Sequence, residues 1–187
     1  MGRILLVTGG ARSGKSSFAE QLTAGLGAAI AYIATAHPFD DEMADRIAKH
    51  RLQRPTTWRT FEAPDRPSTV IAAEGHAFDA LLLDCLTVMT TNRILAQPVD
   101  WDHPPVARMT EVEARVMAEV EAIVAAVAES RADLVAVTNE VGCGIVPGSP
   151  MARFFRDCAG RVNQRMAAAA AEVYLVVSGI PVRIKGT

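Results

Sequence analysis

Gly9-Gly10-Ala11-Arg12-Ser13-Gly14-Lys15-Ser16 is the stretch that decides the fold of this chain. It matches the pattern G-x-x-x-x-G-K-[ST], in which a glycine-rich loop between a strand and a helix binds phosphate groups. The apolar run at 4–8 predicts a buried strand before the loop, and residues 17–22 predict a helix after it. Because the motif has the strand–loop–helix setting that its chemistry needs, it predicts a site for a nucleoside triphosphate.

The residue types of this loop suit phosphate binding. Gly9 and Gly14 allow the tight turn that brings backbone N–H groups onto phosphate oxygens. The helix that follows adds unpaired donors and the positive end of its dipole. We expect Lys15 to reach the β- and γ-phosphates as a catalytic residue, and Ser16 to bind Mg²⁺. All eight residues are predicted nucleotide contacts: Gly9, Gly10, Ala11, Arg12, Ser13, Gly14, Lys15 and Ser16.

The composition is that of a globular protein with no general affinity for charged polymers. Half of the 187 residues are hydrophobic, and the formal net charge is only −2. No apolar run approaches the length of a membrane span, and the N-terminus does not look like a cleavable signal peptide. The three cysteines fit neither a disulfide framework nor a zinc spacing, which favours small buried thiols. We therefore expect one cytoplasmic domain over residues 1–187, with no nucleic-acid partner and no membrane span.

Apolar runs typical of strands alternate with helical patterns along the chain. Strands are expected at 4–8, 30–35, 57–62, 80–84, 134–138 and 173–178, and further helices at 40–54, 67–75, 85–96, 106–130 and 151–171. Strands joined through helices should be parallel. The turn at 179–181 is too short for a crossover, so residues 182–184 should pair antiparallel with the strand before them. The sequence thus predicts a three-layer α/β P-loop NTPase fold with a mainly parallel sheet and one antiparallel C-terminal edge strand.

Polar residues follow several of these strands at the edge where ligands of parallel sheets bind. Asp84 ends a run of apolar residues and has the position of a Walker B acid that binds Mg²⁺. The alternative is that Asp84 caps the next helix. Asn139 and Glu140 begin a glycine-rich loop and are candidates for substrate contact.

The expected helix at 40–54 carries a second set of candidates. Arg46, His50 and Arg54 lie four residues apart and therefore share one face. The flanking positive charge lowers the pKa of the histidine, which favours the neutral imidazole that a nucleophile requires. The two arginines could also bind phosphate oxygens. On spacing alone, a solvated basic helix face remains open as the alternative.

Taken together, the motifs resemble those of one enzyme family, the bifunctional adenosylcobinamide kinase/adenosylcobinamide-phosphate guanylyltransferases of cobalamin biosynthesis. The resemblance spans essentially the whole chain and is far more specific than the P-loop alone. The segments that carry it are residues 4–16, 32–36, 41–43, 46–47 with 50–51, 58–60 with 62, 138–147, 155–157 with 159–164, and 175–179.

The resemblance implies two reactions at one domain. ATP or GTP phosphorylates the aminopropanol hydroxyl of adenosylcobinamide, and GMP from GTP is then transferred to that phosphate through a covalent GMP–histidine. The matching position is His50, and Lys49 stands where some members carry a second histidine. The resemblance also implies a RecA-like sheet and a homotrimer. The nucleotide contacts that it implies are residues 9–16 of the P-loop together with Ala34, Thr35, Ala36, Arg51, Leu52, Gln53, Arg54, Glu62 and Asp84.

Two other functions compete with this interpretation. A monofunctional P-loop kinase of another small metabolite needs only the loop, Asp84 and a substrate loop. A regulatory GTPase would be expected to carry the guanine-reading motif N-K-x-D, which this sequence lacks. His50 therefore separates the bifunctional enzyme from the simple kinase.

Overall fold

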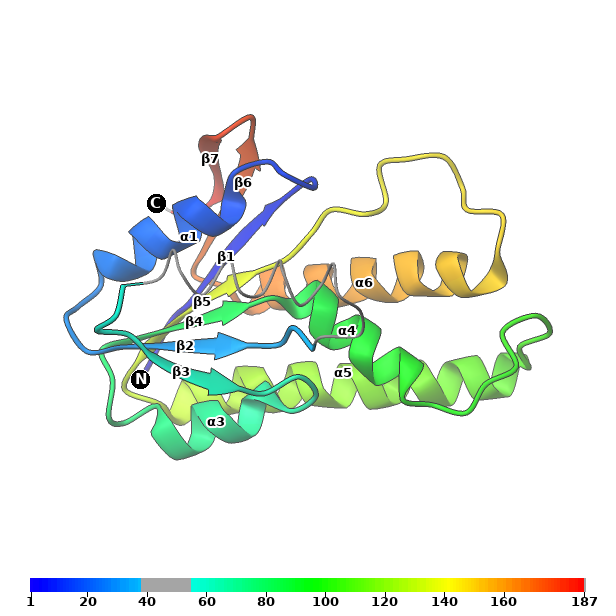
Figure 1. The fold of residues 1–187 in the computed structure, drawn as a ribbon, viewed down its shortest axis with the longest axis horizontal. Helices are drawn as coiled ribbons and strands as arrows, with labels where there is room; N and C mark the ends of the chain where they lie inside the picture. Colours follow the sequence, from blue (N-terminus) through cyan, green and yellow to red (C-terminus); the bar gives the residue numbers. More distant parts are fainter. Residues whose placement is uncertain (38–54, 187) are drawn as a thin grey trace.

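The computed structural model describes residues 1–37 and 55–186. The expected helix at 40–54, with Arg46, His50 and the predicted contacts at 51–54, lies outside the described residues. Within them the chain forms an α/β fold around one seven-stranded sheet, shown in Figure 1.

The sheet has the strand order β3-β2-β4-β5-β1-β6-β7. Its strands are β1 (Ile4–Gly9), β2 (Ile30–Ala34), β3 (Arg59–Glu62), β4 (Ala80–Asp84), β5 (Asp133–Val137), β6 (Glu172–Val177) and β7 (Ile180–Lys185). All neighbouring pairs are parallel except β6 and β7. The expected parallel sheet with one antiparallel C-terminal edge is confirmed.

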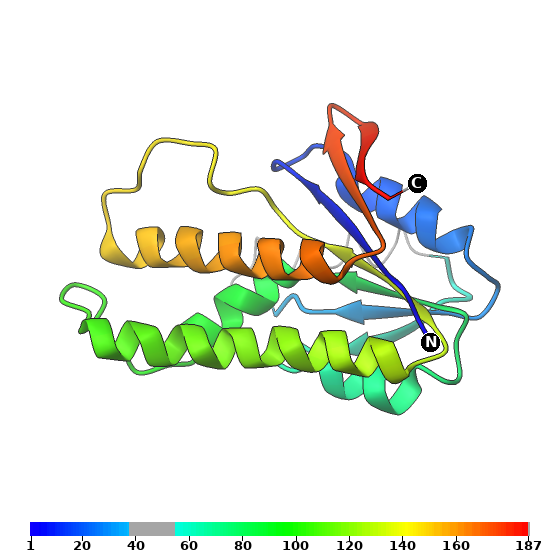
Figure 2. The same ribbon diagram turned by 180° about the vertical axis from the view of Figure 1, so that it is seen from behind.

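The described helices are α1 (Lys15–Ala24), α3 (Pro67–Glu74), α4 (Leu86–Leu95), α5 (Val106–Glu129) and α6 (Pro150–Ala169). In Figures 1 and 2, α1 covers one face of the sheet and α3 to α6 cover the other. The apolar residues of each strand divide accordingly, because successive side chains point to opposite faces. Leu5 and Val7 pack with Ala19 of α1, whereas Ile4 and Leu6 pack toward α3 to α6.

Two of the helices are much longer than the strands they cover. α5 has 24 residues and α6 has 20, whereas the parallel strands have four to six. Both helices therefore extend past the carboxyl ends of the central strands, as Figures 1 and 2 show. The N-terminus of α6 is capped by Ser149, whose hydroxyl accepts a hydrogen bond from the N–H of Ala152 at 3.2 Å.

The last two strands form a tight hairpin. Ser178 and Gly179 occupy its turn with φ angles of 52° and 82°, which is the left-handed conformation that two-residue hairpin turns require. The final strand is longer than the predicted 182–184, because the turn lets pairing begin at Ile180.

The expectation of three buried thiols is wrong for one of them. Cys85 and Cys158 are buried, but Cys143 is exposed, because it lies in the glycine-rich loop between β5 and α6 rather than on a packed element. Among the described helices, none is both long and apolar enough to cross a membrane.

Candidate nucleotide site

The P-loop connects β1, which is buried along its whole length, directly to α1. Gly14 has a φ of 91°, and a side chain there would also press on the Cα of Gly179. A Cβ on Gly9 would lie 2.5 Å from the backbone oxygen of Val176. The glycines expected to permit the turn therefore stand where the backbone conformation or close packing excludes a side chain.

Lys15 lies over the loop rather than out in solvent. Its Nζ donates a 3.0 Å hydrogen bond to the backbone oxygen of Gly10, and the residue is 9% exposed. This bond holds the charged ammonium group of Lys15 against the backbone of the loop. A ring of N–H groups with a lysine is the arrangement that holds the β- and γ-phosphates in P-loop proteins.

Ser13 gives a further sign that the loop is built for a ligand. Its Oγ is buried and has no hydrogen-bond partner among residues 1–37 and 55–186, although buried hydroxyls are nearly always paired. Its backbone oxygen accepts a 2.8 Å hydrogen bond from the N–H of Gly179, so the turn between β6 and β7 packs against the P-loop and stabilises it. The sheet thus holds the loop in shape, while the Ser13 hydroxyl makes no hydrogen bond to the part of the chain that the structure describes.

Three of the predicted nucleotide contacts stand in one row at the carboxyl edge of the sheet. Ala34 of β2 is in register with Glu62 of β3 on one side and with Asp84 of β4 on the other. Glu62 is exposed, and Asp84 is partly buried. The structure therefore brings these predicted residues to the same edge as the P-loop.

Asp84 is held in a fixed orientation. Its Oδ2 accepts a 2.8 Å hydrogen bond from the hydroxyl of Tyr32, while Oδ1 makes no hydrogen bond within residues 1–37 and 55–186. A carboxylate with one oxygen oriented and one open, together with the hydroxyl of Ser16, suits Mg²⁺, which binds few protein oxygens and takes its other ligands from phosphate and water. The donor set present fits the predicted ion.

Thr35 lies in a different environment from Glu62 and Asp84, two other predicted nucleotide contacts at this edge. It is fully buried, its hydroxyl donates to the backbone oxygen of Cys85 at 2.8 Å, and it accepts from the Cys85 N–H at 2.7 Å. Its backbone oxygen accepts a bond from Asn92 at 2.9 Å. These bonds tie the end of β2 to β4 and α4, so the Thr35 hydroxyl is occupied by the protein itself.

Cys85, next to Asp84, is not a candidate nucleophile. Burial, and secondarily the negative charge of Asp84, raises the pKa of its thiol to about 12. The thiol therefore stays protonated at neutral pH, and only the thiolate is strongly nucleophilic.

A hydrogen-bonded network joins β1, β5 and α6 beside the P-loop. Glu140 Oε1 accepts a 2.7 Å bond from the Thr8 hydroxyl and a 3.3 Å bond from Asn163 Nδ2. Asn163 Oδ1 accepts a 2.6 Å bond from the hydroxyl of Thr138. The buried Oδ1 of Asn139 has no partner in the part of the chain that the structure describes. The network fixes the polar residues that follow β5 at the same edge as the loop.

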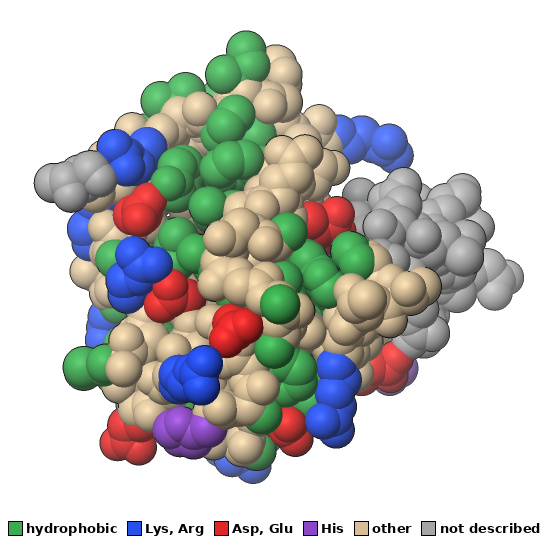
Figure 3. Space-filling model, turned by 90° about the vertical axis from the view of Figure 1, so that its left-hand side faces the viewer, with side chains coloured by type: hydrophobic (Ala, Val, Ile, Leu, Met, Phe, Trp, Pro, Cys, Tyr) green, Lys and Arg blue, Asp and Glu red, His purple; other side chains and the backbone are tan. Residues whose placement is uncertain are grey.

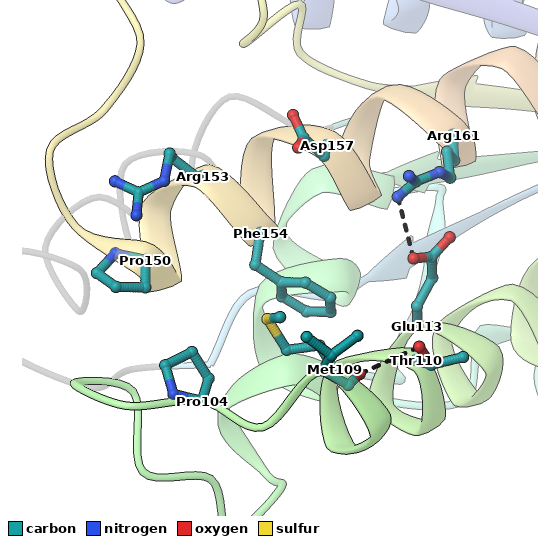
Figure 4. Close-up of a pocket in the computed structure, with 10 residues that line it drawn as sticks. Pro104, Met109, Thr110, Glu113, Pro150, Arg153, Phe154, Asp157 and Arg161 are labelled. Atoms are coloured by element: carbon teal, nitrogen blue, oxygen red, sulfur yellow. Dashed lines mark hydrogen bonds and ion pairs between the residues drawn. The ribbon is translucent and has the colours of Figure 1, made fainter.

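A separate cavity of about 460 Å³ lies between the N-terminal halves of α5 and α6. Figure 4 shows Phe154 and Met109 at its apolar side and the ion pair between Arg161 and Glu113, 3.0 Å, across its far end. Arg153 donates at 2.6 Å to the backbone oxygen of Gly148, which anchors the glycine-rich loop to α6. The residues that line the cavity are Pro104, Val106, Met109, Thr110, Glu113, Pro150, Arg153, Phe154, Asp157 and Arg161.

The site contains supporting residues that sequence reasoning did not single out. Tyr32 orients Asp84, and Thr8 orients Glu140. Both are residues within strands whose types equally suit packing, so only their places in the sheet reveal the role. The polar residues at strand ends were the available signal, and they identified Asp84, Asn139 and Glu140 but not the groups that hold them.

The buried β1, the lysine-closed loop and the helix that starts at Lys15 define a P-loop NTPase fold. The model of the family "Cobinamide kinase / cobinamide phosphate guanyltransferase" matches residues 5–184. The chain belongs to this enzyme family, as its sequence motifs predict.

Relatives with nearly the same length agree with this assignment. The chain is 49% identical over 187 residues to the "Bifunctional adenosylcobalamin biosynthesis protein CobU" of Salmonella typhimurium, and 48% identical to the protein of the same name in Escherichia coli. Both alignments cover 97% of this chain and 99% of the relative. It is also 40% identical to the "Bifunctional adenosylcobalamin biosynthesis protein CobP" of Pseudomonas aeruginosa, with 97% and 96% covered.

Proposed function

We propose that this protein phosphorylates adenosylcobinamide with ATP or GTP and then transfers GMP from GTP to the new phosphate, giving adenosylcobinamide-GDP and pyrophosphate. The observation that carries the proposal is the preformed P-loop, closed by Lys15, in a chain whose residues 5–184 match the model of a family with these two activities. A single domain, residues 1–187, performs both reactions in the cytoplasm.

In the kinase reaction the substrate hydroxyl attacks the γ-phosphorus, and the bond from that phosphorus to the β-phosphate oxygen breaks. The backbone N–H groups of the loop and Lys15 hold the β- and γ-phosphates and stabilise the charge that develops on the leaving diphosphate. Ser16 and Asp84 would hold Mg²⁺. When bound, this ion neutralises phosphate charge.

In the transferase reaction His50 is the nucleophile. Its neutral imidazole attacks the α-phosphorus of GTP, pyrophosphate leaves, and a phosphoramidate bond to GMP forms. The phosphate of adenosylcobinamide phosphate then attacks the same phosphorus and releases His50. The loop and Lys15 hold the departing pyrophosphate. Arg46, Arg51 and Arg54 are available for the α-phosphate, while the backbone at 34–36 and Glu62 contact the nucleotide.

Product analysis tests this function. Purified protein is incubated with adenosylcobinamide, Mg²⁺ and either ATP alone or ATP with GTP, and the corrinoids are identified by chromatography and mass spectrometry. We expect adenosylcobinamide phosphate with ATP alone and adenosylcobinamide-GDP when GTP is present. Formation of the phosphate alone under both conditions would favour a monofunctional kinase, and formation of neither would overturn the proposal.

We further propose that the chain works as a homo-oligomer, a trimer by family resemblance. An exposed apolar edge supports assembly. β7 is exposed along its whole length, and Ile180, Val182 and Ile184 are 67%, 50% and 59% exposed. Hydrophobic side chains gather at the top of the face in Figure 3, where this edge of the sheet lies. Light scattering on the purified protein distinguishes a trimer from a monomer.

A further inference from the structure

We propose that Glu140 is the general base of the kinase reaction. Its carboxylate would take the proton from the substrate hydroxyl as that oxygen attacks the γ-phosphorus. This inference rests on the proposed function and adds a residue with a distinct role to it.

The backbone fixes Glu140 against the beginning of the P-loop. Its N–H donates a 3.1 Å hydrogen bond to the backbone oxygen of Gly9. The next residue of the loop, Gly10, accepts the bond from Lys15 Nζ. Because Lys15 marks the position of the β- and γ-phosphates, Glu140 lies beside the part of the loop where the transferred phosphoryl group is held.

The side chain is oriented with one oxygen held and one open. Oε1 accepts bonds from Thr8 at 2.7 Å and from Asn163 at 3.3 Å. Oε2 makes no hydrogen bond to any part of the chain that the structure describes, and the residue is exposed, so a substrate can reach it. A general base needs this combination of a fixed carboxylate and a free, accessible oxygen.

The residues around Glu140 keep it in this orientation. Asn163 Oδ1 accepts from the hydroxyl of Thr138, which leaves Nδ2 to donate to Glu140 and to the backbone oxygen of Asn139 at 3.0 Å. The Thr87 hydroxyl accepts a 2.8 Å bond from the Asn139 N–H. Contacts from β1, β5, α4 and α6 therefore converge on the residues beside this carboxylate. Supports from several elements are how proteins preorganise a reacting group.

The other carboxylate at this edge is arranged for a different task. Asp84 ends β4, and β5 separates it from β1 and the loop. Asp84 Oδ2 is held by Tyr32 within the sheet edge, and its chemistry suits Mg²⁺. Glu140, by contrast, follows β5 and contacts the loop itself. The two acids thus divide into one that holds the ion and one that accepts a proton.

The chemistry gives Glu140 a role in only one of the two reactions. In the kinase step the hydroxyl oxygen bonds to the γ-phosphorus, the nucleoside diphosphate leaves, and the proton moves to Glu140 Oε2. In the transferase step the attacking phosphate is already an anion, so it has no proton to lose. Loss of the base should therefore separate the two activities.

The test is the Glu140→Gln variant of the full-length protein, assayed for each activity separately. We expect kcat of the kinase reaction to fall by about 10²- to 10⁴-fold, the usual contribution of a general base. Transfer of GMP to supplied adenosylcobinamide phosphate should change by less than about threefold, since it involves no such proton transfer. Glu129→Gln makes the same chemical change at an exposed residue of α5 and serves as the matched control.

Two further measurements separate chemistry from structure. The acidic limb of the wild-type kinase pH–rate profile should be absent in the residual activity of Glu140→Gln. Thr8→Val removes the bond to Oε1 without removing the carboxylate, and should lower kinase kcat by about tenfold, as expected for loss of a hydrogen bond to a charged group.

The outcomes are distinct. Kinase activity of Glu140→Gln within threefold of wild type, or a parallel loss of both activities, would overturn the role of Glu140 while leaving the proposed function standing. Wild-type protein that forms no adenosylcobinamide phosphate would overturn the proposed function and this inference with it.

Discussion

The hydroxyl of Tyr32 donates a 2.8 Å hydrogen bond to Oδ2 of Asp84 across the β2–β4 pair. Tyr32 is 2% exposed, so this contact is made inside the sheet's packed edge. The bond orients one oxygen of the carboxylate, while the other makes no hydrogen bond within the described residues. A buried donor of this kind tunes how strongly the carboxylate binds a cation.

Tyr32→Phe should weaken Mg²⁺ binding and so raise the Mg²⁺ concentration that both activities require. Residues that orient metal ligands typically contribute about 10- to 100-fold in metal affinity, and we expect the lower end here because phosphates and water supply the other ligands. The measurement is the Mg²⁺ concentration for half-maximal rate. Tyr174→Phe is the control, because Tyr174 is the only other tyrosine and its hydroxyl bonds Glu172 at the start of β6. An unchanged Mg²⁺ requirement in Tyr32→Phe would contradict the role of Tyr32.

Gly9→Ala should destabilise the protein and abolish nucleotide binding. Its Cβ would lie 2.5 Å from the backbone oxygen of Val176 and 2.6 Å from Ser13 Oγ, so the loop must move. Such overpacking costs about 1–3 kcal/mol, which corresponds to a Tm lower by roughly 2–12 °C for a protein of this size. Gly10→Ala is the matched control, since no atom lies within 4 Å of a Cβ there. Equal Tm values for the two variants would contradict the packing argument.

The three thiols should differ sharply in reactivity. Burial is the main cause that raises the pKa of both Cys85 and Cys158 to about 12, so neither thiol forms thiolate near neutral pH. Cys143 is exposed in the loop before α6. Native protein treated with an alkylating reagent should be modified at Cys143 alone, and Cys143→Ser should resist labelling until it is unfolded. Fast labelling of native Cys143→Ser would show that the two packed thiols are more accessible than the structure indicates.

Asp79 should make the stability of the folded protein fall as the solution becomes acidic. Its Oδ2 accepts bonds from the N–H groups of Ala29 and Ala28 at 3.0 and 3.1 Å, and these bonds, with Arg131 nearby, lower its pKa below the usual 3.8. The folded state thus binds its proton less readily than the unfolded state. The stabilisation is present above pH 3.8 and is lost as the pH falls through the lower, folded-state pKa.

Asp79→Asn tests this pH dependence by thermal unfolding. Near neutral pH its Tm should lie below that of wild type, and the difference should shrink as the pH falls below 3.8, because wild type then loses its carboxylate bonds. A difference that stays constant or widens in acid would contradict the sign of the effect.

The sequence predicts the layers of this fold well because the signals are local. The apolar runs, the P-loop and the short turn predicted at 179–181 determine most of the strand directions, and the ends of the described elements fall within a few residues of the predictions. Ser149 with Pro150 marks the start of α6 just before the predicted 151, since a capping hydroxyl and a proline both favour a helix start.

The site was predictable only where a motif or a strand end signals it. Asp84 and Glu140 follow strands, so their edge of the sheet could be inferred. Their orientation could not, because Thr8 and Tyr32 contact them across 132 and 52 residues of sequence. Cys143 was misjudged for a related reason, since composition alone does not tell a packed thiol from one in a loop.

We propose that one P-loop serves both a γ-phosphoryl transfer and a GMP transfer through His50. The most direct test is to incubate the protein with Mg²⁺ and GTP labelled in the α-phosphate, without corrinoid, and to locate the label. We predict an acid-labile, alkali-stable GMP adduct on His50 that disappears when adenosylcobinamide phosphate is added and is absent in His50→Ala. Wild-type protein without label, or His50→Ala labelled as strongly as wild type, would contradict the account.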